Sequence, residues 1–291
     1  MNDILQSMFD CLSHSNAIYL PSRFWEALNE KNIQQLESSG LQNFKQTVAQ
    51  NYFTWVVGRR DKQFRYLVRH TSLWAWPAVL KDYFTYDPSV PLNRKQQREL
   101  IIFTRMLWKF AEKNDTEHLL AHIDEPLEGN PFRIHLNGKL ISQDLANSIL
   151  EYYSIRENFK SPTHDKVTIC ELGAGYGRNA YVYLKAFPHC KYIIIDIPPA
   201  LYIAQHYLTS VFRDKKIFVF RPFDRLSDVE SEFNAADIVF LLPHQAEMLP
   251  AKIVDLFINI SSLHEMKIDQ IHAYFKLIDR PKVTSIRNSG G

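Results

Sequence analysis

The chain has 291 residues, of which 46% are hydrophobic, so it can bury the core of one large domain or of two modest ones. Its 34 basic and 32 acidic residues leave a net charge of +2, which creates no overall field favouring nucleic acid or an anionic membrane as a partner. No apolar run reaches the roughly eighteen residues of a membrane span, and no basic flank precedes an apolar block at the N-terminus. We therefore expect a soluble, cytoplasmic protein that binds a small molecule.

The first 130 residues are predicted to be mainly helical. Residues 22–36 and 95–113 carry apolar side chains at helical spacing. Turn-forming residues interrupt this region at Asp87-Pro88 and again at residues 125–131, which read EPLEGNP. The second interruption is the best boundary between a helical N-terminal region, residues 1–130, and a second region, residues 131–291.

Residues 59–76 combine basic and aromatic side chains, a composition that also occurs in proteins that bind single-stranded nucleic acid. The basic residues recur at helical spacing, and the aromatic residues occupy intervening positions. This pattern is typical of a solvated helix face over a buried one. We therefore favour a structural role for this segment and expect no nucleic-acid partner.

A hairpin and a helix are predicted next. Residues 134–140 are expected to be extended with a turn at Asn137-Gly138, and Ser142 is the expected N-cap of the following helix. That helix has an apolar stripe of Leu145, Ile149 and Tyr153, and a polar stripe of Asp144, Asn147, Ser148 and Glu151. The polar stripe either faces solvent or lies near the carboxyl ends of the following strands, where α/β folds bind ligands.

The most informative stretch is residues 167–177, which read VTICELGAGYG. An apolar run rich in β-branched residues leads into three glycines spaced two apart, and Glu171 stands two positions before the first. Such glycines let the backbone turn sharply and approach a ligand closely, and the following helix offers unpaired N–H groups. A second apolar strand, residues 191–197, carries Asp196, which is 23 positions after Gly173. A doubly wound fold has the acid that binds ribose hydroxyls at about this distance.

Strands alternate with helices from residue 167 onward, which predicts an α/β fold with a mostly parallel sheet. Further strands are expected at residues 216–220, 236–242 and 256–262, and crossover helices at 178–187 and 199–211. A final amphipathic helix carries Ile268, Ile271, Phe275 and Ile278 on one side.

Two ligands compete for the glycine loop: a nicotinamide dinucleotide and S-adenosylmethionine. The dinucleotide fingerprint requires glycine three positions after its second glycine, and Arg178 stands there. The Glu-x-Gly-x-Gly-x-Gly arrangement instead resembles the first motif of class I methyltransferases, which have a Rossmann-like fold and use S-adenosylmethionine. The resemblance implies that two groups of residues hold this cofactor: Glu171, Gly173, Ala174, Gly175 and Gly177 at its methionine end, and Asp196 and Ile197 at its ribose.

Several separate segments are similar to one family of these enzymes, the sugar O-methyltransferases. The segments are EPLEGNP from Glu125, ISQDLANSILEYYSI from Ile141, ELGAGYGR from Glu171, IDIPPALYIAQHYL from Ile195 and DLFINISSLHEM from Asp255. They cover roughly the second half of the chain, and the first hundred residues give no comparable match. The resemblance implies transfer of a methyl group to a hydroxyl of a carbohydrate acceptor, which the helical N-terminal region would help to enclose.

His264 is the candidate base for such a reaction. It follows a predicted strand on the side of the sheet where acceptors bind, and an imidazole titrates near working pH. An acceptor hydroxyl must lose its proton as its oxygen is methylated. Glu265 either orients His264 or serves as the base itself, and a structural role for the histidine is the alternative.

Other polar residues at strand and helix ends are candidates for binding. His244 and Gln245 follow a predicted strand and are expected beside the adenine of the cofactor. Gln143 is expected at the cofactor's amino-acid end, and Asn147 and Arg178 are expected to face the acceptor or the cofactor. The sequence has no clustered carboxylates or paired histidines of the kind that bind catalytic metals, so we expect none.

The sequence is too short after its last predicted helix for all the strands that the resemblance implies. Class I methyltransferases usually have seven strands, but only residues 280–291 follow the last helix, enough for one strand at 282–286. Either the sheet is truncated at its C-terminal strands or residues 216–220 are an extra strand. A missing edge would favour a homodimer or instability.

Three other functions remain possible alternatives to methylation of a sugar. They are methylation of a non-sugar hydroxyl, a non-catalytic binding protein with a shortened methyltransferase fold and, as the least favoured, an NAD-dependent oxidoreductase.

Overall fold

A computed structural model describes residues 2–52, 57–81, 83–88, 90–159 and 166–279. Within these residues it contains a parallel five-stranded sheet and a separate antiparallel hairpin. The sheet strands are β3 (Thr168–Leu172), β4 (Lys191–Ile195), β5 (Ile217–Phe218), β6 (Ile238–Leu241) and β7 (Leu256–Ile258), and the hairpin strands are β1 (Ile134–Leu136) and β2 (Lys139–Ile141). The predicted strand at 282–286 lies outside the described residues.

The strand order across the sheet is β5-β6-β4-β3-β7. The register of β3 and β4 aligns Leu172 with Ile195, and on the other side of β3 Glu171 is opposite Ile258 of β7. From β3 the chain first moves outward to β4, and it reaches the opposite neighbour of β3 only at β7. The carboxyl ends of β3 and β7 therefore flank the point where the strand order reverses, which is the usual ligand-binding position of open α/β sheets.

The strand predicted at residues 216–220 is β5, which lies on the outer side of β6. β5 pairs only with β6, at one edge of the sheet, and β6 lies next to β4. Residues 216–220 therefore contribute an outer strand, and the strand predicted at 236–242 takes the place beside β4. The α/β class and the parallel sheet predicted from the sequence are confirmed, and the strand order is compatible with a Rossmann-like fold.

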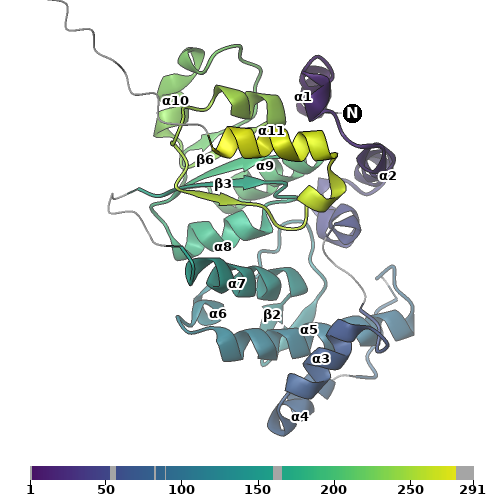
Figure 1. Cartoon of the computed structure of the whole chain (residues 1–291). Helices are drawn as coiled ribbons and strands as arrows, with labels where there is room; N and C mark the ends of the chain where they lie inside the picture. Colours follow the sequence, from purple (N-terminus) through teal and green to yellow (C-terminus); the bar gives the residue numbers. More distant parts are fainter. Residues whose placement is uncertain (1, 53–56, 82, 89, 160–165, 280–291) are drawn as a thin grey trace, which may run out of the picture.

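Helices surround the sheet and extend well beyond it (Figure 1). They are α1 (Asp3–Ser13), α2 (Arg23–Ser39), α3 (Lys62–His70), α4 (Trp76–Leu80), α5 (Arg94–Asn114), α6 (Leu119–His122), α7 (Gln143–Arg156), α8 (Arg178–Ala186), α9 (Ala200–Val211), α10 (Glu230–Ala235) and α11 (Ile268–Ile278). In Figure 1, α8 and α11 lie on opposite sides of the sheet, and α7 and α5 follow α8 in successive layers away from it.

The N-terminal helices share one hydrophobic core with the sheet. Buried residues of α1, such as Met8, and of α5, such as Met106, belong to the same cluster as Ile193 in the central strand β4. α5 packs on α7, and α1 packs on α9. The described part of the N-terminal region thus packs on helices that flank the sheet, and residues of α2 and α3 line a cavity together with residues at the carboxyl ends of the strands (Figure 1).

Local sequence signals account for several element boundaries. Asn93 caps α5 in a reciprocal capping box with Gln96, and Ser142 Oγ accepts a hydrogen bond of 3.0 Å from the backbone N–H of Leu145 at the start of α7. Asn137 and Gly138 both have positive φ in the β1–β2 turn, as the hairpin signal predicts. These boundaries follow from short-range chemistry, so they could be predicted.

Two amphipathic interpretations need correction. α3 ends at His70, so the periodicity expected over residues 59–76 stops before Trp74, whose surface is 93% exposed. Only Phe64 among the aromatic residues of α3 is buried, while Tyr66 is exposed. On α11, Ile268, Phe275 and Ile278 are exposed and Ile271 is half-buried, so the expected apolar side is not buried as a whole, and Tyr274 packs inward.

None of the helices in the described part of the chain combines the length and the apolar character that crossing a membrane would require.

Candidate functional site

A cavity of about 900 Å³ opens at the carboxyl ends of the parallel strands. Residues after β3, β4, β6 and β7 form its floor, and side chains from α2, α3, α5 and α7 form its walls. Of the site residues predicted from the sequence, nine line this cavity: Gln143, Asn147, Gly173, Gly175, Arg178, Asp196, Ile197, His264 and Glu265. The predicted cofactor and acceptor residues therefore share one space.

The first glycine of the loop allows the end of β7 to approach the end of β3. Gly173 has a φ of +73°, and a Cβ atom there would lie 2.3 Å from Ser262 Oγ. Ser262 Oγ and Asn259 Nδ2 both donate hydrogen bonds to the carbonyl oxygen of Leu172, at 3.3 and 2.9 Å. These bonds fix the segment that carries His264 against the glycine loop.

Asp196 joins the glycine loop to the end of β4. Its Oδ2 accepts a hydrogen bond of 2.8 Å from the backbone N–H of Gly175, and its Oδ1 accepts one of 2.7 Å from the N–H of Ile197. Burial disfavours the charged form and raises the pKa of Asp196 to about 7, although these two N–H groups oppose the shift. The carboxylate is half-buried at the cavity wall, where it can accept hydrogen bonds from ligand hydroxyls.

Five residues predicted to bind the cofactor do not line the cavity: Glu171, Ala174, Gly177, His244 and Gln245. The carboxylate of Glu171 is buried in β3, where it accepts hydrogen bonds from Asn179 Nδ2 at 3.1 Å and from the Tyr192 hydroxyl at 2.8 Å. Burial raises the pKa of Glu171. Glu171 therefore connects β3 to β4 and α8 through these hydrogen bonds and does not line the cavity.

The last loop glycine has a packing role. Gly177 has a φ of +86°, and a Cβ atom there would lie 2.9 Å from Leu208 Cδ1 of α9. Ala174 is buried beside it. The glycine spacing thus combines a ligand-facing position, Gly175, with two positions that permit close approach of neighbouring elements.

His244 and Gln245, which are expected beside the adenine, do not line the cavity. Gln245 accepts from the N–H of Leu242 at 2.9 Å and donates to the carbonyl oxygen of Arg221 at 2.9 Å, so both ends of its amide are engaged. His244 Nδ1 is buried without a hydrogen-bond partner among the described residues, and burial lowers the pKa of this imidazole. Pro243, which precedes both, is the residue of this segment that lines the cavity.

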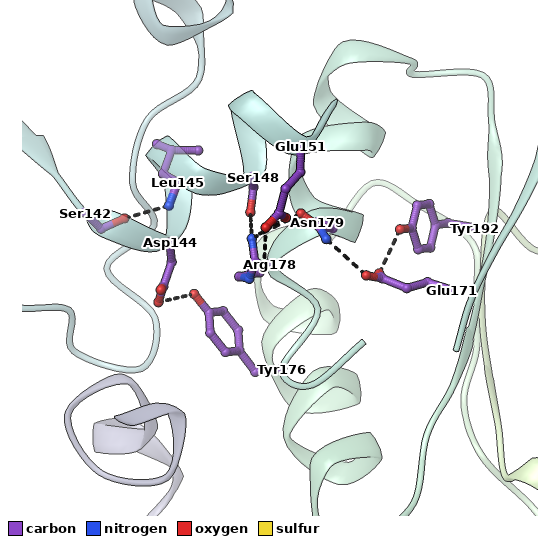
Figure 2. Close-up of polar contacts among 10 residues, drawn as sticks. All are labelled: Ser142, Asp144, Leu145, Ser148, Glu151, Glu171, Tyr176, Arg178, Asn179 and Tyr192. Atoms are coloured by element: carbon purple, nitrogen blue, oxygen red, sulfur yellow. Dashed lines mark hydrogen bonds and ion pairs between the residues drawn. The ribbon is translucent and has the colours of Figure 1, made fainter. Parts of the chain in front are cut away.

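The polar stripe of α7 faces the glycine loop (Figure 2). Asp144 accepts a hydrogen bond of 2.8 Å from the Tyr176 hydroxyl. Arg178 donates to both oxygens of Glu151, at 2.7 and 2.9 Å, and to Ser148 Oγ at 2.8 Å. This stripe is therefore a buried interface that holds α7 on the loop, the second of the two predicted possibilities.

Gln143 contributes an unsatisfied donor to the site. It is the first residue of α7, only 4% of its surface is exposed, and it lines the cavity. Its Nε2 is buried and has no hydrogen-bond partner among the described residues. Because a buried polar group without a partner is destabilising, this amide is suited to donate to a ligand oxygen.

His264 and Glu265 follow β7 in a short helical turn, η7 (Leu263–Glu265). His264 Nε2 lies 3.5 Å from Glu265 Oε1, and their side chains are 68% and 25% exposed. Partial burial raises the pKa of Glu265, and the nearby His264 opposes this shift. Glu265 therefore lies deeper in the site than the histidine that was the first choice as base.

Several cavity residues carry no sequence signal that marks a site. Trp25 of α2 stacks on Tyr52 at a ring-centroid distance of 5.6 Å, and both line the cavity. Another wall of the cavity is formed by residues of α3 and α5: Lys62, Gln63, Tyr66, Leu67, Phe103, Leu107 and Phe110. These residues belong to ordinary amphipathic helices, so only the tertiary fold reveals their common surface.

Across the described residues, no group of three or more His, Cys, Asp or Glu side chains is arranged to hold a metal ion. Comparison with known proteins adds no family assignment, because no protein-family model matches the chain and no curated protein matches it at a significant level. The functional argument therefore rests on the sequence motifs and on the geometry of the cavity.

Proposed function

We propose that the protein is an S-adenosylmethionine-dependent O-methyltransferase that acts on a hydroxyl of a sugar or sugar-containing metabolite. The observation that carries this proposal is one continuous cavity that joins the glycine loop and Asp196 to His264 and Glu265. A donor site and a base on the same cavity are what transfer between two bound molecules requires. The class I methyltransferase form of the Rossmann-like fold is part of the same proposal.

The donor end has groups that fit the cofactor. Gly175 lets the backbone approach a ligand closely, and the carboxylate of Asp196 offers acceptors for the two ribose hydroxyls. The unpartnered Nε2 of Gln143 offers a donor for a carboxylate oxygen at the amino-acid end. When bound, S-adenosylmethionine supplies a methyl group made electrophilic by its sulfonium charge.

The acceptor hydroxyl has to be oriented and deprotonated. His264 and Glu265 can share the proton, because 3.5 Å separates Nε2 from Oε1. With Glu265 ionised and accepting a hydrogen bond from Nε2–H of His264, the lone pair of Nδ1 would take the hydroxyl proton as the oxygen is methylated, and Glu265 would compensate the positive charge that results. Side chains of α2 and α3 line the same space, where they would limit the access of water to a bound acceptor.

Calorimetric titration with S-adenosylhomocysteine, the demethylated product, tests the donor site. We expect 1:1 binding that weakens about thirtyfold or more in Asp196→Ala, because hydrogen bonds to a charged acceptor contribute about 1.5–3 kcal/mol each. Asp224→Ala is the matched control, since Asp224 is exposed and outside the cavity lining. Absence of binding at millimolar ligand, or equal affinity in the Asp196 variant, would contradict the proposal.

Transfer of a labelled methyl group to a panel of sugars and hydroxylated metabolites tests the chemistry. We expect His264→Ala and Glu265→Gln to lower kcat by about a hundredfold or more while the affinity for S-adenosylhomocysteine changes little. The larger loss identifies the base. Unchanged transfer in both variants would overturn this pair as the acid–base group, and a wild-type protein that binds the cofactor but methylates nothing would favour a binding protein.

A further inference from the structure

The part of the cavity that is lined by α3, α5 and α7 has largely apolar walls. Leu67 of α3 and Phe103 and Leu107 of α5 are buried residues that line it, and Phe110 of α5 and Leu150 of α7 are half-buried there. Tyr66 stands at the rim, with its ring centroid 5.8 Å from that of Phe110 in an edge-to-face arrangement. We call this surface, built by α3, α5 and α7, the apolar end.

The charged groups near the apolar end are poorly suited to a phosphorylated ligand. Arg178 lines the cavity, but both oxygens of Glu151 already accept from its guanidinium. Among the described lining residues of α3, α5 and α7, Lys62 is the other cation, and it is exposed at the rim. A sugar nucleotide would bring two phosphate charges that this end does not pair, which would be costly in a partly buried site.

The cavity is also large for a site that holds a single ligand. Sites for drug-sized molecules usually measure about 300–1,000 Å³, and this cavity of about 900 Å³ is near the upper limit. A cofactor held at Gly175 and Asp196 leaves room at the apolar end for a second molecule. That molecule would meet mostly aromatic and aliphatic side chains.

We propose that the apolar end binds an uncharged aromatic or alkyl portion of the acceptor, so that the substrates are amphipathic hydroxyl compounds and not free sugars or sugar phosphates. The identity of the second portion as a methyl acceptor rests on the proposed function, whereas the apolar binding site does not. An aryl or alkyl glycoside and a hydroxylated aromatic compound share this chemistry.

Binding of 2-naphthol, followed by titration calorimetry, tests the apolar end directly. We expect 1:1 binding at least tenfold tighter than that of methyl β-D-glucoside, because burial of a ring removes a large apolar surface from water. Phe110→Ala should weaken 2-naphthol binding about fivefold or more. Leu150→Gln, on a different helix, should weaken 2-naphthol binding similarly. This variant replaces Phe110→Ala in the test if Phe110→Ala is poorly folded. Phe275→Ala is the matched control, because Phe275 is 53% exposed on α11 outside the cavity.

Titration with S-adenosylhomocysteine in the presence of 2-naphthol separates the two proposals. We expect both to bind together, with each affinity changed less than about twofold. Displacement of one by the other, unchanged 2-naphthol affinity in both cavity variants, or methyl β-D-glucoside binding as tightly as 2-naphthol would overturn the apolar end as an acceptor site. Bound 2-naphthol with no affinity for S-adenosylhomocysteine would uphold the apolar site and contradict the proposed function alone.

A third probe distinguishes the two sources of the acceptor. Tighter binding of 2-naphthyl β-D-glucoside than of 2-naphthol would support a glycoside, and the reverse would support a free hydroxylated aromatic compound. Both results support the apolar end as a binding site, and the second would contradict the sugar acceptor of the proposed function.

Discussion

The two ends of the cavity are built in different ways. At the end that contains the glycine loop and Asp196, the proposed donor end, backbone groups and short polar side chains fix the geometry, as in the 2.8 Å hydrogen bond from the N–H of Gly175 to Asp196. At the apolar end, side chains such as Leu107 and Phe110 project from helices that pack by apolar contact. The donor end therefore tolerates little change, whereas the acceptor end can vary in shape without loss of the fold.

A buried ion pair within the N-terminal region contacts the start of α7 through Ser142. Lys45 Nζ lies 2.5 Å from Glu125 Oε1, both side chains are 4% exposed, and Ser142 Oγ donates to the other oxygen of Glu125 at 2.6 Å. Removing one partner leaves an uncompensated buried charge. We expect Lys45→Met to lower the free energy of unfolding by about 3–5 kcal/mol, the largest effect of those considered, measured by urea denaturation.

Two controls isolate that effect. Lys109→Met breaks the half-exposed Lys109–Glu112 pair and should change the unfolding free energy by less than about 1 kcal/mol. The double variant Lys45→Met with Glu125→Leu should recover much of the stability. Equal losses in the Lys45 and Lys109 variants would mean that burial of the Lys45–Glu125 pair does not make it important for stability.

Gly173→Ala tests the rigidity of the donor end. The new Cβ would lie 2.3 Å from Ser262 Oγ, at a backbone position with positive φ. We expect the unfolding free energy to fall by about 3 kcal/mol, from steric overlap and backbone strain together, with weaker binding of S-adenosylhomocysteine.

Gly138→Ala is the matched control for this loop variant. Gly138 also has positive φ, at +84°, but a Cβ there would meet no atom within 4 Å. Strain alone should then lower stability by about 1 kcal/mol and leave binding unchanged. If Gly173→Ala behaved like Gly138→Ala, the close contact between the β3 and β7 ends would not constrain the donor site.

The affinity for the cofactor product should depend on pH through Asp196. Its pKa is raised to about 7, so the carboxylate proposed to accept ribose hydroxyls becomes protonated as the pH falls below that value. We expect S-adenosylhomocysteine to bind about tenfold more weakly at pH 6 than at pH 8. Asp196→Asn should have a much flatter profile, and a wild-type affinity that stays constant over this range would exclude Asp196 from the contact.

Ser142→Ala should have the smallest effect. It removes the N-cap of α7 and one hydrogen bond to Glu125, so we expect a loss of about 1 kcal/mol in the free energy of unfolding. Ser142→Thr keeps a capping hydroxyl and should restore most of it, as measured by thermal denaturation. A full loss in Ser142→Thr would point to packing and not to the cap.

The sequence indicates much of the donor end because its signals are local. The turn at Asn137-Gly138, the Ser142 cap, the glycine loop and Asp196 each depend on backbone geometry set by a few neighbouring residues. Glycine spacing alone could not reveal that Gly173 and Gly177 accommodate Ser262 and Leu208, because these residues are distant in the chain.

The remaining site depends on tertiary contacts that the sequence pattern does not encode. The sequence motif predicts that Glu171 binds the cofactor, yet its carboxylate oxygens accept hydrogen bonds from Tyr192 and Asn179. Trp25 and Tyr52 meet at the cavity although they belong to separate segments of the N-terminal region. For the same reason the apolar end could not be predicted, since its residues are regularly spaced apolar positions of three helices.

A crystal structure of the protein with both S-adenosylhomocysteine and 2-naphthyl β-D-glucoside would test most directly whether one cavity holds a methyl donor beside an amphipathic acceptor. We expect the ribose hydroxyls on the carboxylate of Asp196, the amino-acid end near Gln143, and the naphthyl ring against Phe110 and Leu107, with a sugar hydroxyl facing His264 and Glu265. Electron density for either ligand outside this cavity, or for the naphthyl ring at the glycine loop, would contradict this arrangement.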